Sequence, residues 1–147
     1  MSPEKDAELC AKYPKIFINR NKTMQESPMY FGISTGEGWF DLIDTLCGEL
    51  QSHVNSQIVI RKLSKDAATK VQVVAAQVKS KFSGLRFYVD GGDETTRGMI
   101  NMAEAMSMKI CEECGNRATV QTSGWIRNIC EPCYEKEKKE RKKLSEK

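Results

Sequence analysis

The sequence Cys111-Glu112-Glu113-Cys114-Gly115 is followed, after residues 116–129, by Cys130-Glu131-Pro132-Cys133. Two CxxC pairs at this separation are typical of a site in which four thiolates surround one zinc ion. Each CxxC turn presents two sulfur atoms, so two such turns complete a tetrahedron with no open position for catalysis. The sequence therefore predicts a structural zinc ion held by Cys111, Cys114, Cys130 and Cys133.

The stretch between and after the cysteine pairs predicts how the metal lobe folds. Residues 118–122 and 125–129 flank Ser123-Gly124 and indicate a hairpin. Pro132 suits the first turn of a helix, and the positive end of that helix would stabilise the thiolates of the second pair. A knuckle, a hairpin and a helix that carries the second pair of ligands predict a treble-clef or zinc-ribbon lobe.

Two disulfide bonds or a redox-active CxxC are the alternative interpretations of the same cysteines. Residues 1–6 are polar and charged, unlike a secretory leader, and no βαβ pattern surrounds the motif. These observations favour zinc and a reducing cytoplasm. In that compartment Cys10 and Cys47 are expected to be small apolar residues rather than a bridge.

Length and charge limit the organisation of the chain. It has 147 residues and a formal net charge of +3, and the basic excess lies in its last stretch. We expect an α+β body over residues 1–108, a Cys₄ lobe over 109–134 and a charged helical or disordered tail over 135–147. The balanced charge of the body does not favour a global electrostatic attraction to nucleic acid, and no segment reads as a membrane span.

Periodic apolar residues predict the helices of the body. Pro3 after Ser2 indicates a helix over 3–12, and Asp93 is the expected cap of a helix that runs to about Met108. Methionines on that last helix form a stripe that is typical of core packing and occasionally of an adaptable contact surface. The clearest pattern predicts a helix from Trp39 to about Val54, with an apolar face made of Trp39, Leu42, Ile43, Leu46, Leu50 and Val54.

Residues 70–89 fit two interpretations. The spacing of Val71, Val74 and Val78 suits a helix, but β-branched residues and Ser83-Gly84 favour a hairpin that joins 78–82 to 85–89. We prefer the hairpin. With Ser83-Gly84 as a two-residue turn, Lys81 would lie opposite Arg86, and Lys79 opposite Tyr88.

The outer face of this hairpin is a candidate binding site. Like charges directly opposite each other are unfavourable unless an anion or an acid lies between them. This predicts a site for a phosphate, a nucleotide or an acidic partner at Lys79, Lys81, Arg86 and Tyr88. The alternative is a solvated sheet face that is neutralised by the acids at 90–94.

Three stretches taken together resemble a group of small proteins from tailed bacteriophages and prophages. They are Gly38-Trp39-Phe40-Asp41-Leu42-Ile43, then residues 77–88, then Ala103-Glu104-Ala105-Met106-Ser107 leading to Cys111-Glu112-Glu113-Cys114-Gly115. The most specific pieces are Lys81-Phe82-Ser83-Gly84-Leu85-Arg86-Phe87-Tyr88 and the two cysteine pairs, in that order. Related sequences often carry glycine directly after the phenylalanine, where this chain has Ser83. The resemblance implies a phage accessory protein in the bacterial cytoplasm, and it supplies no mechanism.

Three functions follow from these patterns. No enzyme motif is present, and the single histidine, His53, cannot pair with Cys47 on the same helix, so we expect a non-enzymatic protein. The leading expectation is binding of a host protein, to inhibit a host process or an immune pathway. The alternatives are nucleic-acid binding through Arg117, Trp125, Arg127 and the tail, and sequestration of a small anionic nucleotide by the basic hairpin face.

Overall fold

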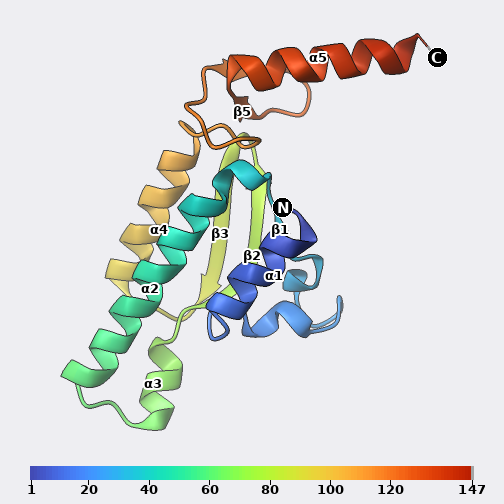
Figure 1. Cartoon of the computed structure of the whole chain (residues 1–147). Helices are drawn as coiled ribbons and strands as arrows, with labels where there is room; N and C mark the ends of the chain where they lie inside the picture. The colour runs from blue at the N-terminus through green and yellow to red at the C-terminus, as the bar shows by residue number, and fades with distance from the viewer. Residues whose placement is uncertain (147) are drawn as a thin grey trace.

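The computed structural model of the protein describes residues 1–146. Its architecture is α+β, as predicted from the sequence (Figure 1). The helices are α1 (Pro3–Lys12), α2 (Phe40–Ile60), α3 (Lys65–Val71), α4 (Glu94–Ser107) and α5 (Glu131–Ser145), together with the 3-10 turns η1 (Ile18–Asn21), η2 (Pro28–Phe31) and η3 (Glu37–Trp39). The strands are β1 (Ile33–Ser34), β2 (Val74–Lys81), β3 (Gly84–Asp90), β4 (Val120–Gln121) and β5 (Asn128–Ile129).

Local sequence signals place the starts of two helices correctly. Helix α1 begins at Pro3, directly after Ser2. Helix α4 begins after Asp93, whose carboxylate accepts a hydrogen bond from the backbone N–H of Thr96 at 3.0 Å. The Thr96 hydroxyl in turn accepts from the backbone N–H of Asp93 at 2.8 Å, which completes a capping box.

The central sheet has the strand order β1-β2-β3. Strand β2 pairs antiparallel with β3, as predicted, and parallel with the two-residue strand β1, which the sequence did not indicate. Val78, Leu85 and Phe87 are buried on the core side of the sheet. The hairpin preferred for residues 70–89 is confirmed, and only Lys70 and Val71 of that stretch are helical, at the end of α3.

The predicted register of the hairpin is wrong. Phe82 and Ser83 form the turn, with φ of 49° and 64°, so that Lys81 pairs with Gly84 and Lys79 pairs with Arg86. Gly84 is the first residue of β3 and not part of the turn, and the flexible side chain of Met108 packs over it, with its sulfur 2.8 Å from the position of an added Cβ. This register buries Leu85 against Val78 and leaves the Phe82 ring in solvent.

Helices α2 and α4 lie side by side against the sheet (Figure 1). Helix α2 carries the predicted apolar face and continues to Ile60, beyond the predicted end at Val54. Helix α4 also covers the free edge of β3, because Glu104 accepts a hydrogen bond from the N–H of Phe87 at 2.9 Å and Ser107 accepts one from Leu85 at 2.8 Å. An edge strand covered in this way cannot pair with another chain.

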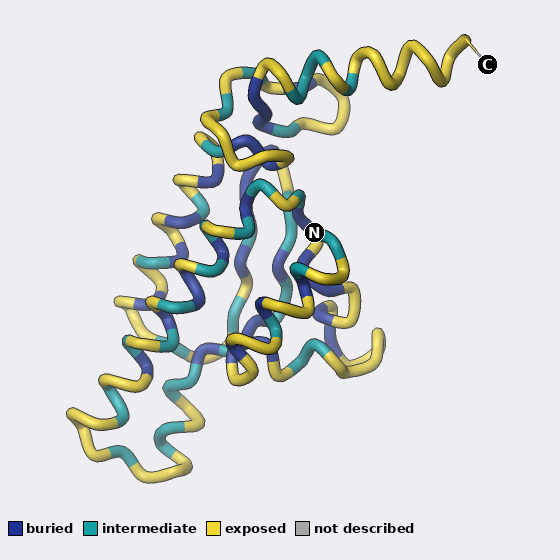
Figure 2. The backbone as a smooth tube through the Cα atoms, in the orientation of Figure 1, coloured by how far each residue is buried: buried dark blue, intermediate teal, exposed yellow. Residues whose placement is uncertain are grey.

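The cysteine-rich lobe lies at one end of the body, and α5 extends away from it (Figure 1). Figure 2 shows that most of α5 is exposed, in agreement with a charged C-terminal helix. The predicted division of the chain after residue 108 stays a prediction. Within residues 1–146 no helix combines the length and the apolar composition that crossing a bilayer requires.

Candidate metal centre and binding surfaces

The four predicted ligands lie together. The sulfur atoms of Cys111, Cys114, Cys130 and Cys133 all lie within 4.8 Å of one another. A tetrahedral site with Zn–S bonds of about 2.3 Å has edges of about 3.8 Å, so the cluster has the size of a Cys₄ site. The sulfurs of Cys114 and Cys130 are 3.5 Å apart, well beyond the length of about 2.05 Å of a disulfide bond.

Three local elements present these thiols, as the sequence predicted. Cys111 and Cys114 lie in a turn that is closed by a 2.9 Å hydrogen bond from the N–H of Gly115 to the carbonyl of Cys111. Strands β4 and β5 form the hairpin that leads to Cys130, the residue before α5. Cys133 lies in the first turn of α5, where the positive end of the helix favours a thiolate.

Hydrogen bonding within the cluster prepares one thiol for deprotonation. The backbone N–H of Cys133 donates to the sulfur of Cys130 and, with smaller contributions from the neighbouring thiols, lowers the pKa of Cys130 to about 7. Burial, together with hydrogen bonds among the thiols, raises the pKa of Cys133. Because thiolates are the metal ligands, binding of a metal ion must release protons, and affinity must fall as the pH falls. The four cysteines can hold a metal ion, and this donor set is one that zinc prefers.

The knuckle that carries the first two cysteines is fitted tightly onto the loop before α2. The backbone N–H of Gly38 donates to the carbonyl of Glu112 at 2.8 Å. A Cβ added at Gly38 would lie 2.1 Å from the carbonyl oxygen of Cys111 and 2.6 Å from the amide nitrogen of Gly115. The two backbones therefore approach so closely that only glycine fits at position 38.

Two side chains strengthen this junction. Glu112 is buried, and its carboxylate accepts hydrogen bonds from the N–H of Gly36 at 3.1 Å and from the hydroxyl of Ser80 at 3.0 Å. The indole N–H of the fully buried Trp39 donates to the carbonyl of Ile110 at 3.0 Å. The cysteine cluster is thus attached to β2 and to the loop that leads into α2, through residues that sequence reasoning did not assign to the site.

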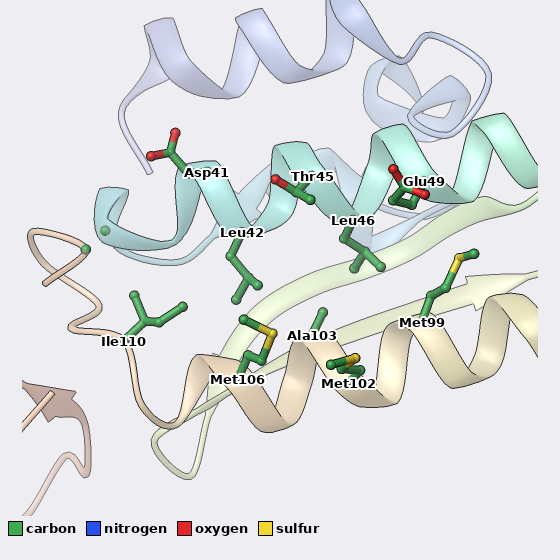
Figure 3. Close-up of a pocket in the computed structure, with 12 residues that line it drawn as sticks. Asp41, Leu42, Thr45, Leu46, Glu49, Met99, Met102, Ala103, Met106 and Ile110 are labelled. Atoms are coloured by element: carbon green, nitrogen blue, oxygen red, sulfur yellow. The ribbon is translucent and has the colours of Figure 1, made fainter. Parts of the chain in front are cut away.

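A groove runs between α2 and α4 (Figure 3). We call it the methionine groove. Its volume is about 410 Å³, and its apolar lining consists of Leu42 and Leu46 from α2, Met99, Met102, Ala103 and Met106 from α4, and Ile110. Met102 and Met106 are 66% and 46% exposed, so part of the methionine stripe faces solvent and is not used to pack the core.

The α2 side of the methionine groove is acidic. Asp41 and Glu49 are exposed along this rim, with Thr45 between them (Figure 3). Neither carboxylate has an ion-pair partner among residues 1–146. They are eight positions apart on the helix, which corresponds to about 12 Å along the helix axis.

The four residues of the basic hairpin face do share one face of the sheet, although their register differs from the prediction. Side chains alternate along a strand, so Lys79, Lys81, Arg86 and Tyr88 lie opposite the buried Val78, Leu85 and Phe87. Lys79 lies directly opposite Arg86, and Tyr88 lies opposite Gln77. One end of this face is hollowed where it meets the loop between β4 and β5.

The candidate nucleic-acid residues of the lobe have different surroundings. Arg127 forms ion pairs with Glu113 of the knuckle and Glu137 of α5, so its charge holds the lobe together. Arg117 is exposed and forms a single β-bridge with Ile110. Trp125 is 74% exposed at the tip of the lobe hairpin.

Comparisons with known protein families, with curated proteins and with solved structures gave no match to this chain.

Proposed function

We propose that this protein is a non-enzymatic binding protein, stabilised by one structural zinc ion, whose methionine groove takes an amphipathic helix of a host protein. The groove between α2 and α4 is the observation that carries the proposal. Its partner helix has apolar residues along one stripe and lysine or arginine beside that stripe. The resemblance to phage-encoded proteins supports a bacterial partner, whose activity this binding would inhibit.

The chemistry of the lining supports a helix as the ligand. Helices bind in apolar grooves through residues at i, i+4 and i+7, and the methionine groove lies between two helices that present apolar side chains to it. Unbranched, polarisable methionine side chains adapt to different partners, and Met99, Met102 and Met106 lie along one wall (Figure 3).

The charge on the rim supports basic residues beside the stripe. Asp41 and Glu49 are unpaired within the described part of the chain and exposed, so a lysine or arginine can approach each of them without displacing an internal partner. Such rim pairs contribute more to orientation and to the rate of association than to affinity.

The choice of zinc as the metal ion is supported by the four cysteine sulfurs of the cluster. Four thiolates fill a tetrahedral shell, so the ion would be structural rather than catalytic. Its task in the proposed function is to hold the knuckle at the Ile110 end of the methionine groove.

Titration with a helical peptide tests this function. The probe is a peptide with leucines at i, i+4 and i+7 and flanking lysines, added to protein with ¹³C-labelled methionine methyl groups. We expect the signals of Met99, Met102 and Met106 to shift on binding, because these side chains line the groove, while those of Met24 and Met29 stay in place. A peptide in which glutamates replace the lysines should bind at least about tenfold more weakly, because it meets the acidic rim.

Two substitutions on α4 make a matched pair for this experiment. Met102→Glu places a charge in the groove and should abolish binding, whereas Ala105→Glu, at an exposed position of the same helix outside the lining, should leave binding unchanged. Equal binding of both peptides, or equal loss in both variants, would refute the helix-binding function. Capture from bacterial lysate with wild-type protein and with the Met102→Glu variant then identifies the partner.

A further inference from the structure

A second hollow lies where the tip of the central hairpin meets the tip of the lobe hairpin. We call it the tip hollow. Its volume is about 420 Å³, and it is lined by Lys79, Ser80, Lys81 and Phe82 on one side and by Gly124, Trp125 and Ile126 on the other. It combines residues from two candidate sites that the sequence treated as separate.

Two aromatic rings stand exposed at the tip hollow. Trp125 is 74% exposed and Phe82 is 72% exposed. Large aromatic side chains are normally buried. Here each ring lies at the tip of a hairpin, where no other part of the described chain covers it. Flat, solvent-facing rings are the platforms on which unpaired bases stack.

The positive charge beside these rings is not neutralised internally. Within residues 1–146, neither Lys79 nor Lys81 forms an ion pair. The ammonium group of Lys81 lies 5.3 Å from the centre of the Phe82 ring, and Arg86 lies directly opposite Lys79. A phosphate bound beside Lys79 and Arg86 would relieve the repulsion between these two paired cations.

The two walls of the tip hollow are fixed relative to each other. The side-chain amide of Asn128 donates to the carbonyl of Ser83 at 3.1 Å in a buried position, which joins β5 to the turn between β2 and β3. Because the walls are held in place before a ligand arrives, binding costs little ordering of the protein.

We propose that the tip hollow binds single-stranded nucleic acid, with bases stacked on Trp125 and Phe82 and phosphates held by Lys79 and Lys81. Alternating aromatic and basic groups match the alternation of bases and phosphates along a strand. Duplexes hide the faces of their bases in the stack, so exposed rings favour an unpaired strand over a double helix. Strands of DNA and of RNA present the same two groups, and both belong to this class.

Fluorescence anisotropy with labelled oligonucleotides of about twelve nucleotides, within the site sizes of known single-strand binders, tests the proposal. We expect binding of a mixed-sequence single strand of DNA or RNA, weaker binding of the matching duplex, and quenching of Trp125 fluorescence by the strand. Trp125→Ala should weaken binding at least about fivefold through the loss of stacking. Since Trp125 is exposed, this variant should keep the wild-type melting temperature.

The salt dependence of binding tests the two lysines. Lys79→Ala with Lys81→Ala should lower the slope of log K against log salt by about 1.4, because each phosphate contact on a single strand contributes about 0.7. Lys65→Ala with Lys70→Ala on α3 is the matched control, with the same change of charge at the other end of the molecule (Figure 1), and it should leave the slope unchanged.

Three results would overturn the proposal. They are the absence of binding at low salt, a preference for the duplex, and equal losses in the tip-hollow and α3 variants. None of these results bears on the proposed binding of a helix in the methionine groove, which is lined by other residues and is tested by the peptide titration.

Discussion

Removal of the metal is expected to unfold the cysteine-rich lobe while α2, α4 and the central sheet remain folded. Outside the cysteines, the small buried cluster of the lobe contains Ile129, with Val120 and Tyr134 only partly buried against it. So few apolar side chains cannot hold a chain of this length in one conformation. Binding of structural zinc supplies on the order of 10–16 kcal/mol in comparable sites, which exceeds any other single contribution to the lobe.

Metal analysis and limited proteolysis measure this effect. The wild-type protein should contain one zinc ion per chain, and a strong chelator should release it and open residues 111–134 to protease. Cys130→Ser should behave like the chelated protein, whereas Cys10→Ser, a cysteine outside the cluster, should keep its zinc. A Cys130→Ser variant with full zinc content and a protected lobe would contradict the assignment of the ligands.

Gly38→Ala is expected to destabilise the protein by about 2–3 kcal/mol, although it adds a single methyl group. The new Cβ would lie 2.1 Å from the carbonyl oxygen of Cys111 and 2.7 Å from the carbonyl carbon of Glu112. Both contacts are with backbone, so no side chain can rotate away, and the knuckle must move off the loop before α2. The melting temperature should fall by about 5–10 °C, and the variant should lose zinc to a chelator more readily than the wild type.

Gly98→Ala is the matched control, and its expected effect has the opposite sign. Gly98 lies in α4, and nothing lies within 4 Å of a Cβ at this position. Alanine should therefore stabilise the protein by about 0.5–1 kcal/mol, because it lowers the conformational entropy that the unfolded chain loses on folding. Thermal unfolding of the two variants separates a steric effect at the knuckle from a general effect of glycine replacement. Equal melting temperatures for the two variants would show that the close approach at Gly38 is not a constraint.

Features that depend on neighbouring residues in sequence were predicted well. The spacing of the cysteines defined the cluster, Asp93 defined the start of α4, and the apolar period from Trp39 defined the buried face of α2. The helix cap and the apolar period depend on residues within one or two helical turns of each other. The spacing of the cysteines reflects the coordination geometry that a zinc site requires.

Features that depend on distant residues were missed. The turn of the central hairpin was placed at Ser83-Gly84 because glycine favours turns, whereas distant residues hold the observed turn: Ser107 accepts from the N–H of Leu85, and Asn128 donates to the carbonyl of Ser83. The methionine stripe of α4 was expected to pack in the core, but Met106 is 46% exposed and lines the methionine groove together with Leu42 and Ile110. The tip hollow joins residues about forty positions apart, so no local pattern could bring Lys81 and Trp125 together.

The bond between Trp39 and Ile110 also constrains the order in which a newly made chain can fold. These residues are 71 positions apart, and the ribosome releases Trp39 long before its partner. Until then the indole N–H has no carbonyl to bind, and burying it would cost free energy. The core around Trp39 is therefore completed late in synthesis, at about the moment when Cys111 and Cys114 emerge. We expect nascent chains that stop short of Ile110, which lack the partner of the Trp39 indole, to be more open to proteases than the full-length chain.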